Sequence, residues 1–277
     1  MARNPRDLDL YGNPAGYEGY MGRWSMALAP SFVRFACSHE PNSLLDLGCG
    51  TGSLIRAAAQ SFPRARLVGM DPVPDYLAYP RATVERGRAT FVVGLVEQIP
   101  FADGVFDCCL SLLLLQEIQD RELALSEMRR VTGRGGIVAA CQWDFRHGMP
   151  MLAAIGEVLH EVSPEVYESL GTRQTSPFTS EAELRRYWKA AGLADVETAR
   201  LVTTRPYTSF DYLWQPLLSG STPVSAAVAT LPQEVRDEVH WRLRERILGE
   251  SRDESFTLRA EAFAIRGRLR AAGERTQ

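Results

Sequence analysis

The chain has little of what marks a metal or disulfide protein. Its 277 residues include 4 histidines and 5 cysteines. The histidines are scattered without the spacing of metal ligands, and the sequence contains no C-x-x-C pair. Four cysteines lie inside apolar stretches, where a free thiol behaves as a small hydrophobic side chain. We therefore expect buried, reduced thiols and no metal site.

Long apolar runs and an excess of either charge are also missing. The longest apolar run, around "CCLSLLLL", is far shorter than the ~20 residues of a membrane span, and "MARNPRDLDLYGNP" lacks the apolar segment of a signal peptide. The 31 Lys and Arg against 34 Asp and Glu leave a net charge of -3, which gives no electrostatic reason to expect nucleic acid as a partner. We expect a cytoplasmic monomer or homodimer with no nucleic-acid or membrane partner.

What the first half does contain is an alternation of strand and helix signals. The apolar runs expected as strands are Ser43 to Leu47, "ARLVGMD", "ATFVVG", "VFDCCLSLLLL" and "GRGGIVAACQW". Between them, helices are predicted over "SLIRAAAQSF", from Pro74 onward and over Arg121 to Val131, with Pro80 shortening or kinking the second. Near-continuous apolar strands alternating with helices indicate a doubly wound parallel sheet, covered on both faces.

The second half is less regular and more helical. A helix is predicted from Pro150 to Leu170 with a break around Ser163 and Pro164, and another from an N-cap at Thr179 or Ser180 to Gly192. "ADVETARLVTTR" alternates as a strand, residues 206 to 250 read as mostly helical, and "SFTLRAEAFAIRGR" alternates as the last strand.

The stretch "LLDLGCGTGSL" follows the first expected strand and raises the question of what its glycines approach. In a parallel sheet, ligands bind at the carboxyl ends of the strands, and the start of a helix attracts polar or anionic groups through its N–H groups. Asp71, at the end of the second strand, is placed to hold ribose hydroxyls. The glycines are spaced G-x-G-x-G, whereas dinucleotide sites use G-x-G-x-x-G. A nucleoside-bearing cofactor other than a dinucleotide is favoured, and a mere tight turn stays open.

With "LLDLGCGTG", "VGMD" and "VEQIPFADGVFDCCLSLLLLQEIQDRELALSEMRRVTGRGGIVAA", the chain resembles the class I S-adenosylmethionine-dependent methyltransferases over roughly residues 40 to 142. The resemblance implies an α/β, Rossmann-like, doubly wound and mostly parallel seven-stranded sheet. A helical cap precedes it and a helical insertion precedes the last strand. We expect a single domain, with residues 1–40 as the cap, 41–145 as the cofactor-binding core, and 146–277 as lid, substrate-covering helices and last strands.

The resemblance also assigns residues to the cofactor S-adenosylmethionine and its product S-adenosylhomocysteine. The expected cofactor-binding residues are Arg23, Asp46, Gly48, Cys49, Gly50, Gly52, Asp71, Pro72, Leu95, Val96 and Ser111. Arg23 is expected near the methionine carboxylate and Asp71 on the ribose. Cys49 reads as a small filler and not as a nucleophile. Leu95 departs from the family, which usually has an Asp there to accept a hydrogen bond from the adenine amine. The loss costs ~1 kcal/mol.

No specific catalytic signature is present, and methyl transfer needs a base only when the acceptor must lose a proton. The candidates are His147, Glu117 and Tyr17, of which His147 has the most suitable chemistry. A lone histidine in a loop is more often simply exposed, and the aromatic cluster Phe210, Tyr212 and Trp214 suits either an acceptor lid or helix packing.

These residues predict a methyltransferase that acts on a small organic acceptor, in secondary or specialised metabolism. Three other functions stay open. A protein of the same fold that binds S-adenosylmethionine can promote cyclisation or rearrangement, a degenerate site can bind the cofactor without catalysis, and a nicotinamide oxidoreductase is the alternative disfavoured by the glycine spacing.

Overall fold

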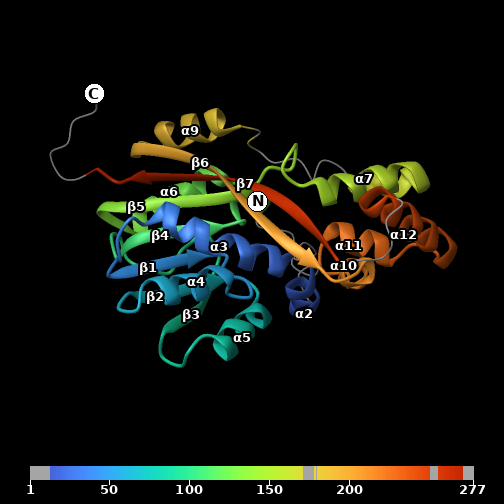
Figure 1. Cartoon of the computed structure of the whole chain (residues 1–277). Coiled ribbons are helices and arrows are strands. Elements are labelled where there is room, and N and C mark those ends of the chain that lie inside the picture. The colour runs from blue at the N-terminus through green and yellow to red at the C-terminus, as the bar shows by residue number, and fades with distance from the viewer. Residues whose placement is uncertain (1–12, 171–177, 179, 250–254, 271–277) are drawn as a thin grey trace. The chain divides into compact units, whose positions relative to one another are not determined.

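Seven strands form one sheet in the computed structural model, which describes residues 13–170, 178, 180–249 and 255–270 (Figure 1). The strands are β1 (Ser43–Leu47), β2 (Arg66–Asp71), β3 (Ala89–Val93), β4 (Phe106–Leu112), β5 (Thr132–Trp143), β6 (Ala194–Tyr207) and β7 (Phe256–Arg268). Their order in the sheet is β3-β2-β1-β4-β5-β7-β6. The pairs from β3 to β5 are parallel, and β5 pairs with β7 in the antiparallel sense. The predicted doubly wound, mostly parallel seven-stranded sheet is confirmed.

The chain divides into two compact units, each assembled from three separate stretches. Unit 1 comprises residues 1–27, 144–176 and 202–261, and unit 2 comprises residues 28–143, 177–201 and 262–277. The elements α3, β6 and β7 each contribute residues to both units. The predicted cap, core and lid segments, residues 1–40, 41–145 and 146–277, are consecutive along the chain and do not correspond to these two units. Their assignment to a single domain stays a prediction.

Unit 2 holds the parallel part of the sheet and the helices that cover it. Its helices are α3 (Arg23–Ala36, from residue 28 onward), α4 (Ser53–Ser61), α5 (Pro74–Thr83), η2 (Leu115–Glu117), α6 (Arg121–Val131) and α9 (Glu181–Ala190). Met128 of α6 and Trp188 of α9 are fully buried in one core with Cys109 of β4. The neighbouring Cys108 points to the opposite face, where its Sγ lies 3.2 Å from the Sγ of Cys37, just after α3. Both faces of the sheet are therefore covered.

Unit 1 is mostly helical. Its helices are α2 (Pro14–Tyr17), η1 (Glu18–Gly22), α7 (Pro150–Val162), α8 (Pro164–Leu170), α10 (Phe210–Leu217), α11 (Pro223–Ala229) and α12 (Gln233–Leu248). The predicted break at Ser163 and Pro164 is confirmed, because α7 ends and α8 begins there. Arg246 of α12 pairs with Glu157 and Glu161 of α7.

All five cysteines of the chain are buried and free, as expected.

One local prediction was wrong. β4 ends at Leu112 instead of continuing through the leucine run, because Leu113 adopts a left-handed conformation with φ of 64° and turns the chain. α5 includes Pro80 and ends at Thr83, and the predicted shortening or kink at Pro80 stays a prediction.

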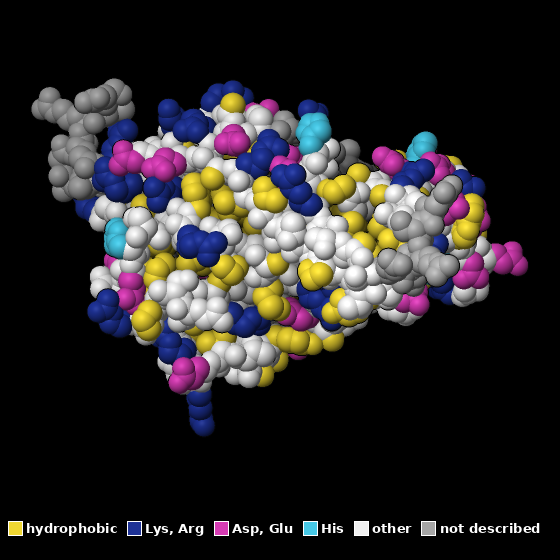
Figure 2. Space-filling model, in the orientation of Figure 1, with side chains coloured by type: hydrophobic (Ala, Val, Ile, Leu, Met, Phe, Trp, Pro, Cys, Tyr) yellow, Lys and Arg dark blue, Asp and Glu magenta, His cyan; other side chains and the backbone are white. Residues whose placement is uncertain are grey.

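The surface shows no segregation of charge on the face drawn in Figure 2, where basic and acidic side chains are interspersed. Among the described residues, no helix combines the length and apolar character needed to cross a membrane.

Candidate functional site

The glycine loop between β1 and α4 is held in a conformation that only glycine adopts easily. Gly48, Gly50 and Gly52 have φ of 66°, 50° and 88°, in the left-handed region. A Cβ on Gly48 would lie 2.8 Å from the Leu114 side chain, and one on Gly52 would lie 2.5 Å from Pro80. A Cβ on Gly50 would meet nothing closer than Tyr76, at 3.7 Å. The protein's own packing therefore requires Gly48 and Gly52, whereas a Cβ on Gly50 would make only ordinary van der Waals contact.

The loop is tied to the end of β2. The backbone N–H groups of Gly48 and Cys49 both donate to the Met70 carbonyl, at 2.8 and 3.0 Å, and the Gly50 N–H donates to Oδ2 of Asp71 at 2.9 Å. The expectation that the loop presents unpaired N–H groups is wrong for these three amides. They fix the loop on β2, because a buried N–H needs a partner.

Asp71 connects the loop to the next helix. Its Oδ1 accepts from the Val73 N–H at 2.9 Å, just before α5, and the residue is buried at the carboxyl end of β2 beside half-buried Pro72. An ionised carboxylate has room for more than one hydrogen bond on each oxygen. Asp71 is thus positioned by two backbone amides, as a rigid polar group at this edge of the sheet.

Asp46 is the unusual residue of the site. It lies in β1, opposite Gly69 of β2 and Leu110 of β4, and is 1% exposed. Neither of its carboxylate oxygens has a hydrogen-bond partner in the described chain. Burial raises the pKa of Asp46 well above its usual range, the Asp71 carboxylate adds to the rise, and the Ile55 N–H opposes it in part. An orphaned buried carboxylate indicates a site where a cationic or hydrogen-bonding group is expected.

Cys49 lies in the same buried environment. Burial raises the pKa of its thiol well above the usual range, and Asp46 and Asp71 add to the rise. The thiol therefore stays protonated and unreactive at neutral pH.

The third and fourth strands bring further predicted residues to this edge. Leu95 follows β3 and is 43% exposed, while Val96 is buried. Ser111, near the end of β4, is fully buried and its hydroxyl has no partner in the described chain. Leu95 after β3 and Ser111 near the end of β4 are thus both at the carboxyl ends of parallel strands.

Leu113 was missed by the sequence reasoning. Its left-handed backbone, held by a 2.7 Å hydrogen bond from its N–H to the Cys141 carbonyl, turns the chain so that Leu114 packs beside Gly48. No property of a leucine run signals this turn. Strained non-glycine residues of this kind cluster at functional sites.

A family model described as a methyltransferase domain matches residues 45–140, the stretch that carries this geometry. Over residues 45–140 the chain matches a methyltransferase domain, so the resemblance predicted from the motifs is confirmed for this stretch.

Relatives of known name support the family. The chain is 31% identical over 174 residues to a malonyl-acyl-carrier-protein O-methyltransferase of Dechloromonas aromatica. The aligned region covers 62% of this chain and 60% of that protein. It is 29% identical over 207 residues to a demethylmenaquinone methyltransferase of Roseiflexus castenholzii, and the aligned region covers 68% of this chain and 84% of that protein. The chain thus spans less than two thirds of the length of the first of these relatives.

Among solved structures, the (4+2)-cyclase SpnF has a similar fold. It superposes with a TM-score of 0.52 at 16% identity, covering 88% of this chain and 80% of that one.

Four predicted residues do not belong to the loop or to the ends of β1 to β4. Glu117, in η2 of unit 2, is exposed. In unit 1, Tyr17 ends α2, and His147 is exposed in a turn where its N–H donates to Oδ1 of Asp144 at 3.1 Å. Arg23, also in unit 1, donates to the Tyr212 hydroxyl. The predicted cofactor-binding residues of the glycine loop and of β1 to β4 therefore all belong to unit 2. Tyr17, Arg23 and His147 belong to unit 1.

Proposed function

We propose that this protein is an S-adenosylmethionine-dependent methyltransferase that acts on a small organic acceptor. The observation that carries the proposal is the pair Asp46 and Asp71. One is an orphaned buried carboxylate, the other is fixed by the glycine loop, and they lie on neighbouring strands. Two carboxylates that repel each other in a buried site favour a ligand with positive charge and hydroxyl groups. S-adenosylmethionine supplies both.

The residues present fit the cofactor. Asp71 would hold the ribose hydroxyls, and the glycine loop around Gly50, where no side chain of the loop intervenes, would take the methionine end. Leu95 would pack on the adenine, with the main chain of Val96 at the ring edge. When bound, S-adenosylmethionine supplies an electrophilic methyl group on a positively charged sulfur. The protein's own contribution is alignment of the acceptor and exclusion of water.

The nature of the acceptor is supported by the comparisons and by the surface. The relatives are named for organic acceptors, a malonyl group and demethylmenaquinone. The net charge of -3 and the interspersed charges in Figure 2 give no electrostatic support for a nucleic-acid acceptor.

Calorimetric titration with S-adenosylmethionine, S-adenosylhomocysteine and NAD tests the cofactor. The first two are expected to bind and NAD is not. Asp71→Asn should weaken S-adenosylhomocysteine binding by tenfold or more, since a hydrogen bond to a charged group contributes about 1.5–3 kcal/mol. Asp75→Asn, at an exposed carboxylate in the first turn of α5, is the matched control and should leave the affinity unchanged.

Equal loss in both variants, or binding of NAD alone, would contradict the proposal. Because SpnF shares the fold, release of S-adenosylhomocysteine in the presence of a panel of organic acceptors must also be measured to show transfer.

A further inference from the structure

A second group of orphaned polar atoms lies in unit 1, far along the chain from the glycine loop. Arg205 of β6 is 6% exposed, and its guanidinium carbon lies 4.5 Å from the Tyr207 ring centroid and 5.7 Å from that of Tyr212. Its Nη1 donates a long hydrogen bond of 3.3 Å to the Tyr20 carbonyl. Its Nη2 has no partner in the described chain.

Other donors in the same group also lack acceptors. The hydroxyl of Tyr20 and the indole Nε1 of Trp24 are buried without a hydrogen-bond partner in the described chain. Arg23 lies on Tyr212, with its guanidinium carbon 4.7 Å from the ring centroid. We refer to Tyr20, Arg23, Trp24, Arg205, Tyr207 and Tyr212 as the arginine–tyrosine cluster.

The cluster has an excess of donors and positive charge. Arg205 makes no ion pair with a carboxylate among the described residues, and the groups that act on its pKa besides burial are Tyr207 and Arg23. Burial lowers the pKa of Arg205, yet a guanidinium remains charged in proteins. Stacking on the tyrosine rings stabilises the cation through the ring faces, but it leaves Nη2 of Arg205 without a partner in the described chain. A buried charge and buried donors without acceptors are costly, so the arrangement indicates a missing anionic acceptor.

We propose that the arginine–tyrosine cluster binds a carboxylate carried by the methyl acceptor. The proposal rests on the proposed function, and it names the substrate class as a small organic acid. A planar guanidinium matches a carboxylate through two parallel hydrogen bonds. Arg23 is already engaged by Tyr212, so Arg205 and the neutral Tyr20 and Trp24 donors suit a single negative charge.

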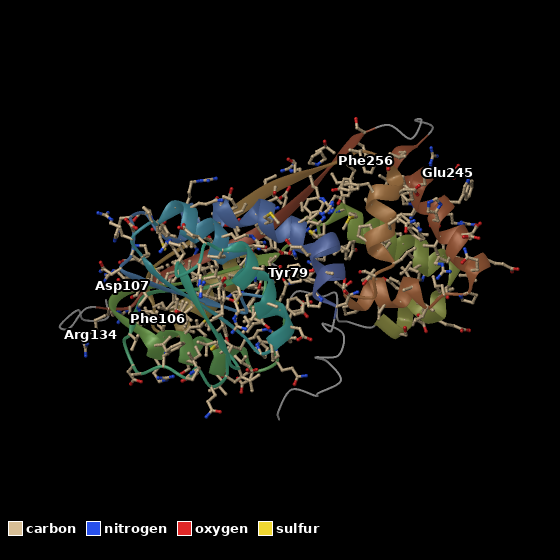
Figure 3. All side chains as sticks on the ribbon, turned by 90° about the horizontal axis from the view of Figure 1, so that it is seen from below. Tyr79, Phe106, Asp107, Arg134, Glu245 and Phe256 are labelled. Carbon is tan, nitrogen blue, oxygen red and sulfur yellow. The ribbon has the colours of Figure 1, made fainter. Side chains whose placement is uncertain are left out.

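The walls of the cluster indicate the body of that acid. Tyr207 is 1% exposed and stacks on Phe256, labelled in Figure 3 at the start of β7, with ring centroids 5.2 Å apart and planes 10° apart. Tyr212 contacts Tyr207 edge to face at 6.2 Å. Such walls suit a flat aromatic or apolar body attached to the carboxylate.

The test compares carboxylates with their neutral amides. Benzoate, phenylacetate and cinnamate, and the three corresponding amides, are titrated into the full chain, first alone and then with saturating S-adenosylhomocysteine. Binding is followed by calorimetry and by the shift of the unfolding midpoint. At least one carboxylate should bind tenfold or more tightly than its amide, the factor expected for one charge-assisted pair.

Variants assign the effect to the cluster. Arg205→Gln should remove the preference for the carboxylate, Arg205→Lys should retain part of it, and S-adenosylhomocysteine affinity should be unchanged in both. Arg259→Gln is the matched control, because Arg259 lies on β7 in the same unit with its side chain 60% exposed. It should behave as the wild type.

Three results would overturn the proposal. The first is that the wild type binds carboxylates and amides equally well, or binds neither. The second is that Arg205→Gln lowers S-adenosylhomocysteine affinity, which would assign the cluster to the cofactor's own carboxylate. The third is that the Arg205 variants unfold at a lower midpoint while Arg205→Lys and a folded Arg205→Met keep the full preference for carboxylates, which would make the residue structural. Failure of S-adenosylmethionine to bind the wild type contradicts the proposed function, while the titrations without cofactor still report on the cluster.

Discussion

Asp46 and Asp71 show how two identical side chains on neighbouring strands acquire different properties. Asp71 accepts from the N–H groups of Gly50 and Val73, whereas Asp46 is buried without a hydrogen-bond partner in the described chain. Backbone amides hold the first in place, and burial destabilises the ionised form of the second.

The buried position of Asp46 predicts a pH-dependent stability. Its folded-state pKa is raised well above the ordinary value of about 3.9, so the folded chain holds a proton that the unfolded chain releases. Stability therefore falls as pH rises from about 4 through the raised pKa, by about 1.4 kcal/mol for each pH unit of this window. Asp46→Asn removes this loss. The difference between the unfolding midpoints of the variant and the wild type should be larger at about pH 8 than at about pH 5. The same difference at both pH values would show that Asp46 is not protonated in the folded chain.

Leu95 predicts a gain of function by a single substitution. Leu95→Asp restores an acceptor for the adenine amine, and at 43% exposure the carboxylate costs little in folding. One net hydrogen bond of ~1 kcal/mol should tighten S-adenosylhomocysteine binding about fivefold, measured by calorimetry. Val93→Asp, at another exposed apolar residue nearby in the sequence, should not change the affinity. Weaker binding by Leu95→Asp would mean that the apolar packing of Leu95 on the adenine contributes more to affinity than the added hydrogen bond.

His147 is the residue whose catalytic role depends on the acceptor. If it removes a proton from the acceptor, His147→Gln should lower kcat tenfold or more. The affinity for S-adenosylhomocysteine should stay the same. An unchanged kcat would leave alignment alone as the source of catalysis.

At the scale of elements, the sequence predicts the strands and helices of unit 2 because their apolar runs are nearly continuous and their boundaries coincide with glycines, prolines and capping residues. Ser180, one of two predicted N-caps, does accept from the Glu183 N–H. The end of β4 was not predictable, because the left-handed turn at Leu113 depends on tertiary contacts and not on residue type.

For the candidate site, the sequence predicted the positions of the residues but not the contacts between them. The motif placed Asp46, Asp71 and the glycines at one edge of the sheet, but their hydrogen bonds to each other depend on the three-dimensional approach of β2 to the loop. Arg205 was missed, although a signal existed. It alternates with Thr203 and Tyr207 on the buried face of β6, where an arginine is uncommon.

The glycine loop predicts an ordered series of stabilities. Gly52→Ala should lower the free energy of unfolding by about 2 kcal/mol or more, because left-handed strain adds to a clash with Pro80 at 2.5 Å. Gly50→Ala should cost only about 1 kcal/mol, since its Cβ would make no contact closer than 3.7 Å, yet it should abolish S-adenosylhomocysteine binding. Urea unfolding and calorimetry give the two readouts. The reverse order of stabilities, or a Gly50→Ala variant that binds normally, would contradict this account of the loop.

At the scale of the whole molecule, the chain passes repeatedly between two units, and each of them holds one of the proposed sites. In unit 2, the proposed cofactor site contains the buried carboxylate of Asp46, whose oxygens have no partner in the described chain. In unit 1, the arginine–tyrosine cluster contains buried donors of Tyr20, Trp24 and Arg205. A transferase needs to hold a donor and an acceptor molecule. A buried carboxylate suits a positively charged methyl donor, and a group of buried donors suits an acid as acceptor.

Hydrogen exchange should resolve the two binding events on one chain. S-adenosylhomocysteine is expected to slow exchange around residues 44–55, 69–73 and 94–98 of unit 2, because a bound ligand lowers the population of opened states. A carboxylate that binds the arginine–tyrosine cluster should instead slow exchange around residues 18–25 and 203–213 of unit 1. Arg205→Gln should cancel the second effect and preserve the first, and Asp71→Asn should do the opposite. Protection of the same residues by both ligands would mean that they compete for one site, and would rule out separate positions for the methyl donor and the acid.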